Sequence, residues 1–109
     1  MVKFTIIFRK PSKLEAFESQ YNHFLALVEQ MPLITRRQVN SVLGSPLGES
    51  PYYRVLEVYY DSYEHMQESL TSAAGQEAGS ELRKFTLGTY QMMFADVFEE
   101  DGGSSPQRQ

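Results

Sequence analysis

Glu57 is the residue whose type and position could best support chemistry, because it lies in the middle of the run YYRVLEVYY at 52–60. β-Branched and aromatic residues dominate this run, so we expect a strand in which Glu57 shares one face with Tyr53 and Tyr59. Burial of a carboxylate among such neighbours raises its pKa toward the range in which a general acid or base operates. We therefore predict that Glu57 is the acid/base group of a small apolar pocket, in which the tyrosine hydroxyls orient a ligand.

Both features also have a purely structural interpretation. Glu57 could form a salt bridge with an arginine such as Arg37 or Arg54, or it could be exposed near the edge of the sheet. The tyrosines could simply fill the core of a dimer. The sequence leaves these alternatives open.

His23 is the second candidate for catalysis. It lies beside the apolar stripe of a predicted helix, and an imidazole can act as an acid or base near neutral pH. A lone histidine on a helix is more often a surface or packing residue, so that alternative also stays open. The chain has no cysteine, no HExxH motif and no histidine–carboxylate cluster. We therefore expect neither a metal site nor a cofactor.

The loop GSPLGESP at 44–51 begins like a glycine-rich phosphate loop, but its context differs. A phosphate loop leads from a strand into a helix whose N-terminal amides bind the anion, whereas this loop connects two predicted strands. No lysine follows Gly48, and Pro46 and Pro51 remove two amide donors. We therefore predict a simple hairpin connection.

The segments that must position these residues follow a βαββαβ order. We predict strands at 2–9, 34–43, 52–60 and 87–98. A capping box of Ser12 and Glu15 opens a helix whose apolar stripe ends at Pro32, and Asp61 or Ser62 opens a second helix, followed by a shorter helical piece at 76–85. This order predicts an α+β, ferredoxin-like fold with a four-stranded antiparallel sheet and two helices on one face.

Both faces of the strand at 52–60 are largely apolar, although two helices can cover only one face of a sheet. An antiparallel sheet with one solvated face should alternate apolar with polar residues. The last strand repeats the pattern, with Met92 and Phe94 on one face and Met93 and Val97 on the other. The smallest partner that could cover the second face is another copy of the chain, so we predict a homodimer packed sheet to sheet.

The composition limits the class of protein. A chain of 109 residues with 41% hydrophobic and 13% aromatic residues is typical of one folded domain, which we place at 1–98. We expect the polar tail at 99–109 to be disordered. The net charge of −4 without a basic patch argues against nucleic acid as a partner. No apolar run is long enough to cross a membrane and no signal peptide is recognisable, so we expect a cytoplasmic protein.

Several stretches carry a family resemblance: AFESQY, MP, GSPLGES, YYDS and SLTSAAGQEAGSELRKF. Together they resemble the EthD-like family of the dimeric α/β-barrel superfamily, which is named for a component of an ethyl tert-butyl ether degradation system. The resemblance covers about residues 2–98, and it implies that two ferredoxin-like subunits pair as a dimeric α/β barrel. It also implies a homodimeric small-molecule-binding protein, either a cofactor-free enzyme or an accessory protein in the oxidative degradation of small organic or aromatic compounds. The alternative is a non-catalytic interaction protein with a closed dimer interface and no ligand pocket.

The first helix departs from the family pattern, which reads Tyr-x-x-x-His-x-Pro-Leu. Counted back from Pro32, the family histidine position holds Phe24. His23 is displaced by one residue, which is about 100° around a helix. Either His23 takes over after a local shift of the helix, or the histidine has been lost. The candidate residues are His23 and Glu57 for catalysis, and Tyr21, Phe24, Tyr53 and Tyr59 for binding a small apolar or aromatic ligand.

Overall fold

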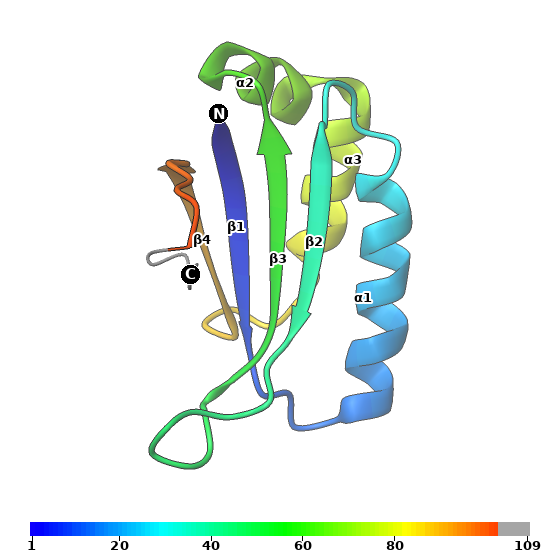
Figure 1. The fold of residues 1–109 in the computed structure, drawn as a ribbon. Coiled ribbons are helices and arrows are strands. Elements are labelled where there is room, and N and C mark those ends of the chain that lie inside the picture. The colour runs from blue at the N-terminus through cyan, green and yellow to red at the C-terminus, as the bar shows by residue number, and fades with distance from the viewer. Residues whose placement is uncertain (103–109) are drawn as a thin grey trace.

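A computed structural model describes residues 1–102, which form one sheet with a layer of helices on one side (Figure 1). The elements are β1 (Val2–Arg9), α1 (Leu14–Val28), β2 (Arg36–Ser41), β3 (Tyr52–Tyr60), α2 (Tyr63–Thr71), α3 (Ala73–Leu82) and β4 (Tyr90–Asp96). The strands lie in the order β2-β3-β1-β4, and neighbouring strands are antiparallel. This confirms the predicted ferredoxin-like α+β fold, with the second helical region divided into α2 and α3. Most of the predicted tail, residues 103–109, lies outside the described part of the chain.

Serine caps explain where two helices begin. The Ser62 hydroxyl accepts a hydrogen bond from the His65 amide (3.1 Å), as a cap at the start of α2 should. The Ser72 hydroxyl accepts one from the Gly75 amide (3.0 Å) and opens α3. The second cap places the start of α3 earlier than the predicted piece at 76–85.

Three other predicted elements, α1, β2 and β4, differ from the structure at their ends. The predicted capping box of Ser12 does not form, because α1 begins after Lys13, which makes no side-chain cap. β2 is shorter than the predicted strand at 34–43. β4 begins later than predicted, because Gly88 adopts a φ of 82° in a turn just before it, and it ends earlier than predicted, at Asp96.

The hydrophobic core lies between the sheet and the helices. Phe8 of β1 is at its centre, and its ring centroid lies 5.4–5.5 Å from those of Phe17, Tyr21 and Phe85. Two of these contacts are edge-to-face, which is a favoured geometry for aromatic rings. The core thus anchors α1 and the segment after α3 to the same side of the sheet.

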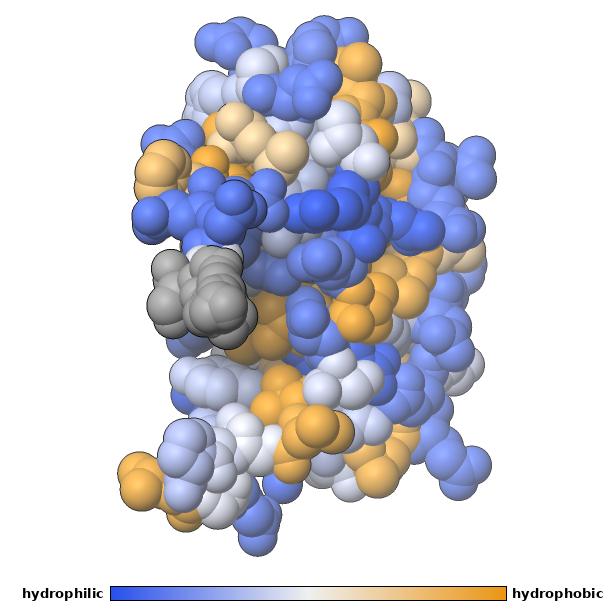
Figure 2. All heavy atoms as spheres, viewed as in Figure 1, coloured by the Kyte–Doolittle hydropathy of each residue, from blue (hydrophilic) through white to orange (hydrophobic). Residues whose placement is uncertain are grey.

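The opposite face of the sheet, which we call the open face, has no helix over it in the described chain (Figure 1). Apolar and polar side chains are mixed across the side of the molecule that this view presents (Figure 2). Ile7 opposes Val55 on this face, and Met93 opposes Thr5. Met93 is 45% exposed. The open face therefore offers apolar surface, although it is less uniformly apolar than predicted.

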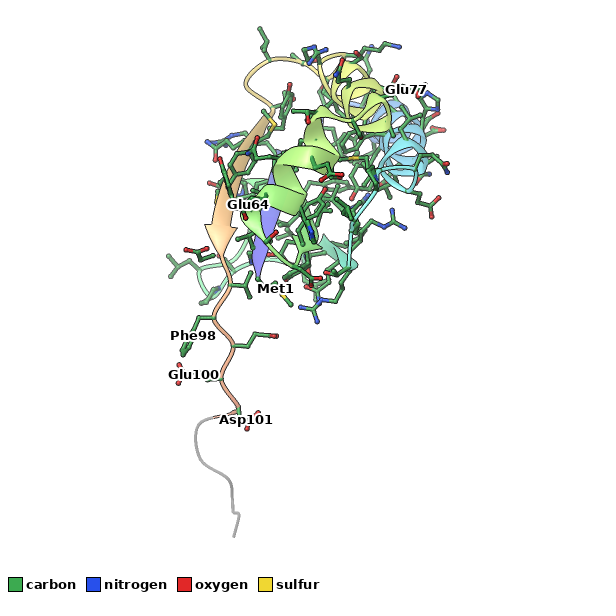
Figure 3. The ribbon with its side chains drawn as sticks, turned by 90° about the horizontal axis from the view of Figure 1, so that it is seen from above. Met1, Glu64, Glu77, Phe98, Glu100 and Asp101 are labelled. Carbon is green, nitrogen blue, oxygen red and sulfur yellow. The ribbon has the colours of Figure 1, made fainter. Side chains whose placement is uncertain are left out.

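The chain after β4 runs away from the helical layer (Figure 3). The Val97 amide donates to the Met1 carbonyl (2.9 Å), after which Phe98 is 85% exposed. The acidic side chains of Glu100 and Asp101 follow it outward (Figure 3). This segment, 97–102, ends the described chain as an arm beside the open face.

Among residues 1–102, none of the helices combines the length and the apolar composition needed to cross a membrane.

Candidate functional site

Glu57 lies on the open face and is held by two polar neighbours. Its Oε2 accepts a hydrogen bond from Lys3 Nζ (2.6 Å), and its Oε1 accepts one from Asn40 Nδ2 (3.3 Å). The hydrogen bond to Glu57 is the main reason that the pKa of Lys3 is raised. Glu57 thus forms an ion pair in a mixed environment and does not face an apolar pocket within the described chain.

An ion pair was one of the alternatives for Glu57, but the predicted partners were wrong. Lys3 reaches Glu57 because it is the diagonal neighbour of Glu57 on the same face of adjacent strands. Arg37 and Arg54 project from the helical face and pair with Glu29 (3.0 Å) and Glu18 (2.8 Å) instead.

Tyr59 lies beside Glu57 on the open face, as predicted. Its hydroxyl donates to Gln38 Oε1 (3.0 Å), and the Arg36 guanidinium lies 4.3 Å from the ring centroid. These neighbours leave Tyr59 only 5% exposed.

Tyr53 does not share the face of Glu57, which corrects the prediction. Phe8 opposes Arg54 and Arg9 opposes Tyr52, so Tyr53 is the extra residue of a β-bulge. The bulge brings the Tyr53 ring to the helical side, 5.4 Å from Phe17 of α1. Strand periodicity cannot show such a bulge, because one extra residue reverses which face a side chain occupies.

A partly buried polar cluster forms around Arg54 on the helical side. Arg54 donates two hydrogen bonds to the Glu18 carboxylate (2.8 and 3.1 Å), and the Tyr53 hydroxyl donates a third (2.5 Å). The bonds from Arg54 and then from Tyr53 lower the pKa of Glu18, and the bond to Glu18 raises the pKa of Tyr53. The Tyr21 hydroxyl is buried without a partner in the described chain, and burial raises its pKa.

His23 is on the outer surface of α1, with 62% of its side chain exposed. Its Nε2 lies 3.6 Å from Oε1 of Glu81 on α3, which also binds Lys84 Nζ at 3.1 Å. His23 therefore bridges two helices on the side away from the sheet. It does not take the place of a histidine at position 24.

A cavity of about 410 Å³ lies between α3 and the sheet, and we call it the α3 cavity. Most of its lining is apolar and comes from the sheet, α1, α2 and α3. The lining residues are Phe4, Phe24, Met31, Val58, Leu70, Gly75, Gln76, Ala78, Gly79, Ser80, Leu82, Arg83, Tyr90 and Met92. Phe24, which stands at the family histidine position, is thus the one residue of the predicted set that lines this cavity.

The α3 cavity exists because several residues of α3 that line it are small. Gly75, Ala78 and Gly79 contribute almost no side-chain volume where α3 faces the sheet. Gly75 is required by packing, because a Cβ there would lie 2.2 Å from the Ser69 carbonyl oxygen of α2. The run AAGQEAGS was the sequence signal for this cavity, but small residues on a helix can equally indicate close packing.

The predicted site residues therefore occupy several places. Glu57 and Tyr59 share the open face, whereas Tyr21 and Tyr53 belong to the partly buried Arg54 cluster. Phe24 lines the α3 cavity, and His23 faces outward.

Comparison with known proteins identifies relatives of similar length. No family model matches the chain. An uncharacterized 11.0 kDa protein of the thcB–thcC intergenic region of Rhodococcus erythropolis is 27% identical over 100 residues, which is 88% of this chain and 94% of the relative.

Three solved structures have similar folds. A cofactor-independent oxygenase, SnoaB of Streptomyces nogalater, is 15% identical with a TM-score of 0.67, over 94% of this chain and 97% of its own. A dimeric protein of unknown function with a ferredoxin-like fold from Bacteroides fragilis is 17% identical with a TM-score of 0.64, over 88% and 95%. At these identities the likeness concerns the fold alone.

The third structure is a protein of the ethyl tert-butyl ether D (EthD) family from Bacillus halodurans. It is 29% identical, with a TM-score of 0.86 over 90% of this chain and 99% of its own. Nearly the whole of both chains superimposes, and the strand order is the ferredoxin-like one derived above. The chain is therefore similar to the EthD family in both sequence and fold, which supports the predicted resemblance to the EthD-like family of dimeric α/β barrels.

Proposed function

We propose that this protein is a homodimer that binds a small apolar or aromatic compound in the α3 cavity. The observation that carries the proposal is the cavity of about 410 Å³ with its mostly apolar lining. Concave, mostly apolar spaces of a few hundred cubic ångströms are the usual form of small-molecule sites. Because an apolar cavity of about 150 Å³ can hold benzene, this cavity has room for a two-ring compound.

Binding has more support than acid/base catalysis. Glu57 and His23 lie outside the α3 cavity, and Phe24 adds apolar surface where the family pattern has a histidine. Of the lining residues, only Tyr90 and Arg83 are ionisable. Such a lining can hold and orient a compound, and an accessory role in the breakdown of small organic compounds fits it.

The proposed dimer packs the open faces of two sheets together. Ile7, Val55 and Met93 supply apolar surface from three adjacent strands. A solved protein of the same fold is dimeric. The α3 cavity lies on the helical side of the sheet, so each subunit of the dimer keeps its own binding site. We place this dimer in the cytoplasm, which a chain without cysteines fits.

A cavity-filling substitution tests the proposed site. Ala78→Leu adds side-chain volume inside the cavity, so we expect it to weaken the binding of 2-naphthamide, a neutral two-ring probe, at least tenfold in isothermal titration calorimetry. Ala73→Leu makes the same change at an exposed position of α3 outside the cavity and should leave binding unchanged. Thermal unfolding should show that both variants are folded.

Two results would contradict the proposal. If Ala78→Leu binds the probe as well as the unmodified protein does, the ligand does not occupy the α3 cavity. If the unmodified protein binds no two-ring compound, the interaction protein without a ligand pocket becomes the better account.

A further inference from the structure

The polar lining residues of the α3 cavity form a single stripe. Gln76, Ser80 and Arg83 follow one another at four- and three-residue steps, so they share one side of α3. All three are exposed, which places them at the mouth of the cavity. Beside them, Gly75, Gly79 and Leu82 make a second stripe that is apolar. A ligand under α3 would therefore meet apolar surface on one edge and polar groups on the other.

The Arg83 guanidinium is held across this mouth. Its Nη2 donates to Ser80 Oγ (3.1 Å). A Cβ built on Gly79 would lie 3.6 Å from Nη1, so the guanidinium folds back over a glycine. The Gln76 amide is also held, because its Nε2 donates to the Thr71 carbonyl oxygen (2.9 Å).

Arg83 has no carboxylate within 4.0 Å among residues 1–102. In the same part of the chain Arg9 also has none, whereas Arg36, Arg37 and Arg54 each have one. The acidic residue two positions before Arg83, Glu81, is already shared between His23 and Lys84. Arg83 is thus a cation without a carboxylate partner in the described chain, at the mouth of an apolar cavity, where it can bind an anionic group of a ligand.

We infer that the ligand of the α3 cavity is an amphipathic carboxylic acid, with an aromatic or alicyclic body inside the cavity and its carboxylate on Arg83. The inference rests on the proposed function, since it concerns the same cavity. Guanidinium is suited to this role because its planar donors match the two oxygens of a carboxylate. The Ser80 hydroxyl, which accepts from Arg83 and keeps its own proton to donate, completes the anionic end of the site.

A pair of nearly isosteric probes tests this inference. We expect 2-naphthoate to bind about fivefold to tenfold more tightly than neutral 2-naphthamide at low salt, a modest preference because Arg83 is exposed. The preference should shrink as ionic strength rises. Arg83→Met keeps most of the apolar stem but removes the charge, and it should abolish the preference while leaving 2-naphthamide binding unchanged.

Lys84→Met is the matched control. It removes the same charge from the neighbouring residue, which pairs with Glu81 and does not line the cavity. It should preserve the preference for 2-naphthoate. The inference is overturned if both probes bind the unmodified protein equally, or if Arg83→Met and Lys84→Met reduce the preference to the same extent. Those results leave the proposed cavity site intact, whereas failure of both probes to bind would refute the proposed function itself.

Discussion

At the scale of single residues, Glu18 is the carboxylate that balances the charge of Arg54 in the partly buried polar cluster. It accepts both hydrogen bonds from Arg54, whose side chain is only 11% exposed, and a third from Tyr53. The bond to Glu18 is also the main reason that the pKa of Arg54 is raised. Without Glu18, a nearly buried guanidinium would lose its counter-charge.

Replacement of this carboxylate should therefore destabilise the fold. Loss of one partner of a buried pair costs about 3–5 kcal/mol. Because the Glu18 side chain is 38% exposed, we expect Glu18→Gln to lower the free energy of unfolding by only about 1–2 kcal/mol at pH 7. Glu77→Gln is the charge-matched control, because Glu77 is exposed on α3 and forms no ion pair in the described chain. It should change the free energy of unfolding little. Urea unfolding measures the free energy of unfolding of both variants.

The effect of Glu18→Gln should also depend on pH. The pKa of Glu18 is lower in the folded protein than its ordinary value of 4.5. The stability from its charge is therefore complete above that value and is lost as the pH falls through the folded-state pKa. The difference between Glu18→Gln and the unmodified protein should shrink in that acid range. A difference that stays constant down to acid pH would contradict a role for the Glu18 charge.

Single-residue roles were the least predictable part of the molecule. The sequence suggested that Glu57 could form an ion pair, but it could not identify the partner. Lys3 is 54 residues away along the chain and reaches Glu57 only because of the strand register. The position of Tyr53 depends on a bulge, and that of His23 on the rotation of α1 about its axis. None of these features has a local sequence signal.

At the scale of elements, α3 determines where the cavity lies. Its two glycines serve different purposes, although both line the α3 cavity. A Cβ at Gly75 would approach the carbonyl oxygens of Ser69 and Leu70 to 2.2 and 2.6 Å. At Gly79 the nearest atom is Arg83 Nη1, at an ordinary contact distance of 3.6 Å.

The same substitution should therefore have opposite effects at the two glycines. Gly75→Ala forces backbone to move between α2 and α3, so we expect a loss of about 2–4 kcal/mol in the free energy of unfolding. Gly79→Ala meets no backbone clash and should stabilise the protein by up to about 1 kcal/mol through helix propensity. Urea unfolding of the two variants side by side is the measurement. If Gly75→Ala leaves the free energy of unfolding unchanged, or if Gly79→Ala lowers it as much as Gly75→Ala does, the packing of α3 differs from this description.

The order of elements could be predicted because it depends on local patterns. The β-branched and aromatic residues of β1 and β3 and the apolar stripe of α1 each identify an element within a short stretch of sequence. The ends of β2 and β4 could not be placed, since tertiary pairing sets where a strand stops. The α3 cavity could not be predicted either, because the small residues of AAGQEAGS are equally compatible with close packing of the helix.

At the scale of the whole molecule, two surfaces are proposed for two different tasks. The helical side holds the α3 cavity, and the open face is the proposed contact between subunits. Val55 lies at the centre of the open face, between Ile7 and Asn40 of the adjacent strands. Val39 is 49% exposed on the helical face of the edge strand β2. A charge at Val55 should therefore separate the subunits, and the same charge at Val39 should not.

Native mass spectrometry in the presence of 2-naphthamide is the experiment to do first, because it reports assembly and ligand uptake together. From subunits of 12.5 kDa, we expect a dimer that binds two molecules of the probe. Val55→Glu should give monomers, and Val39→Glu should remain dimeric. An unmodified protein that is monomeric, or a dimer that takes up no probe, would contradict the account.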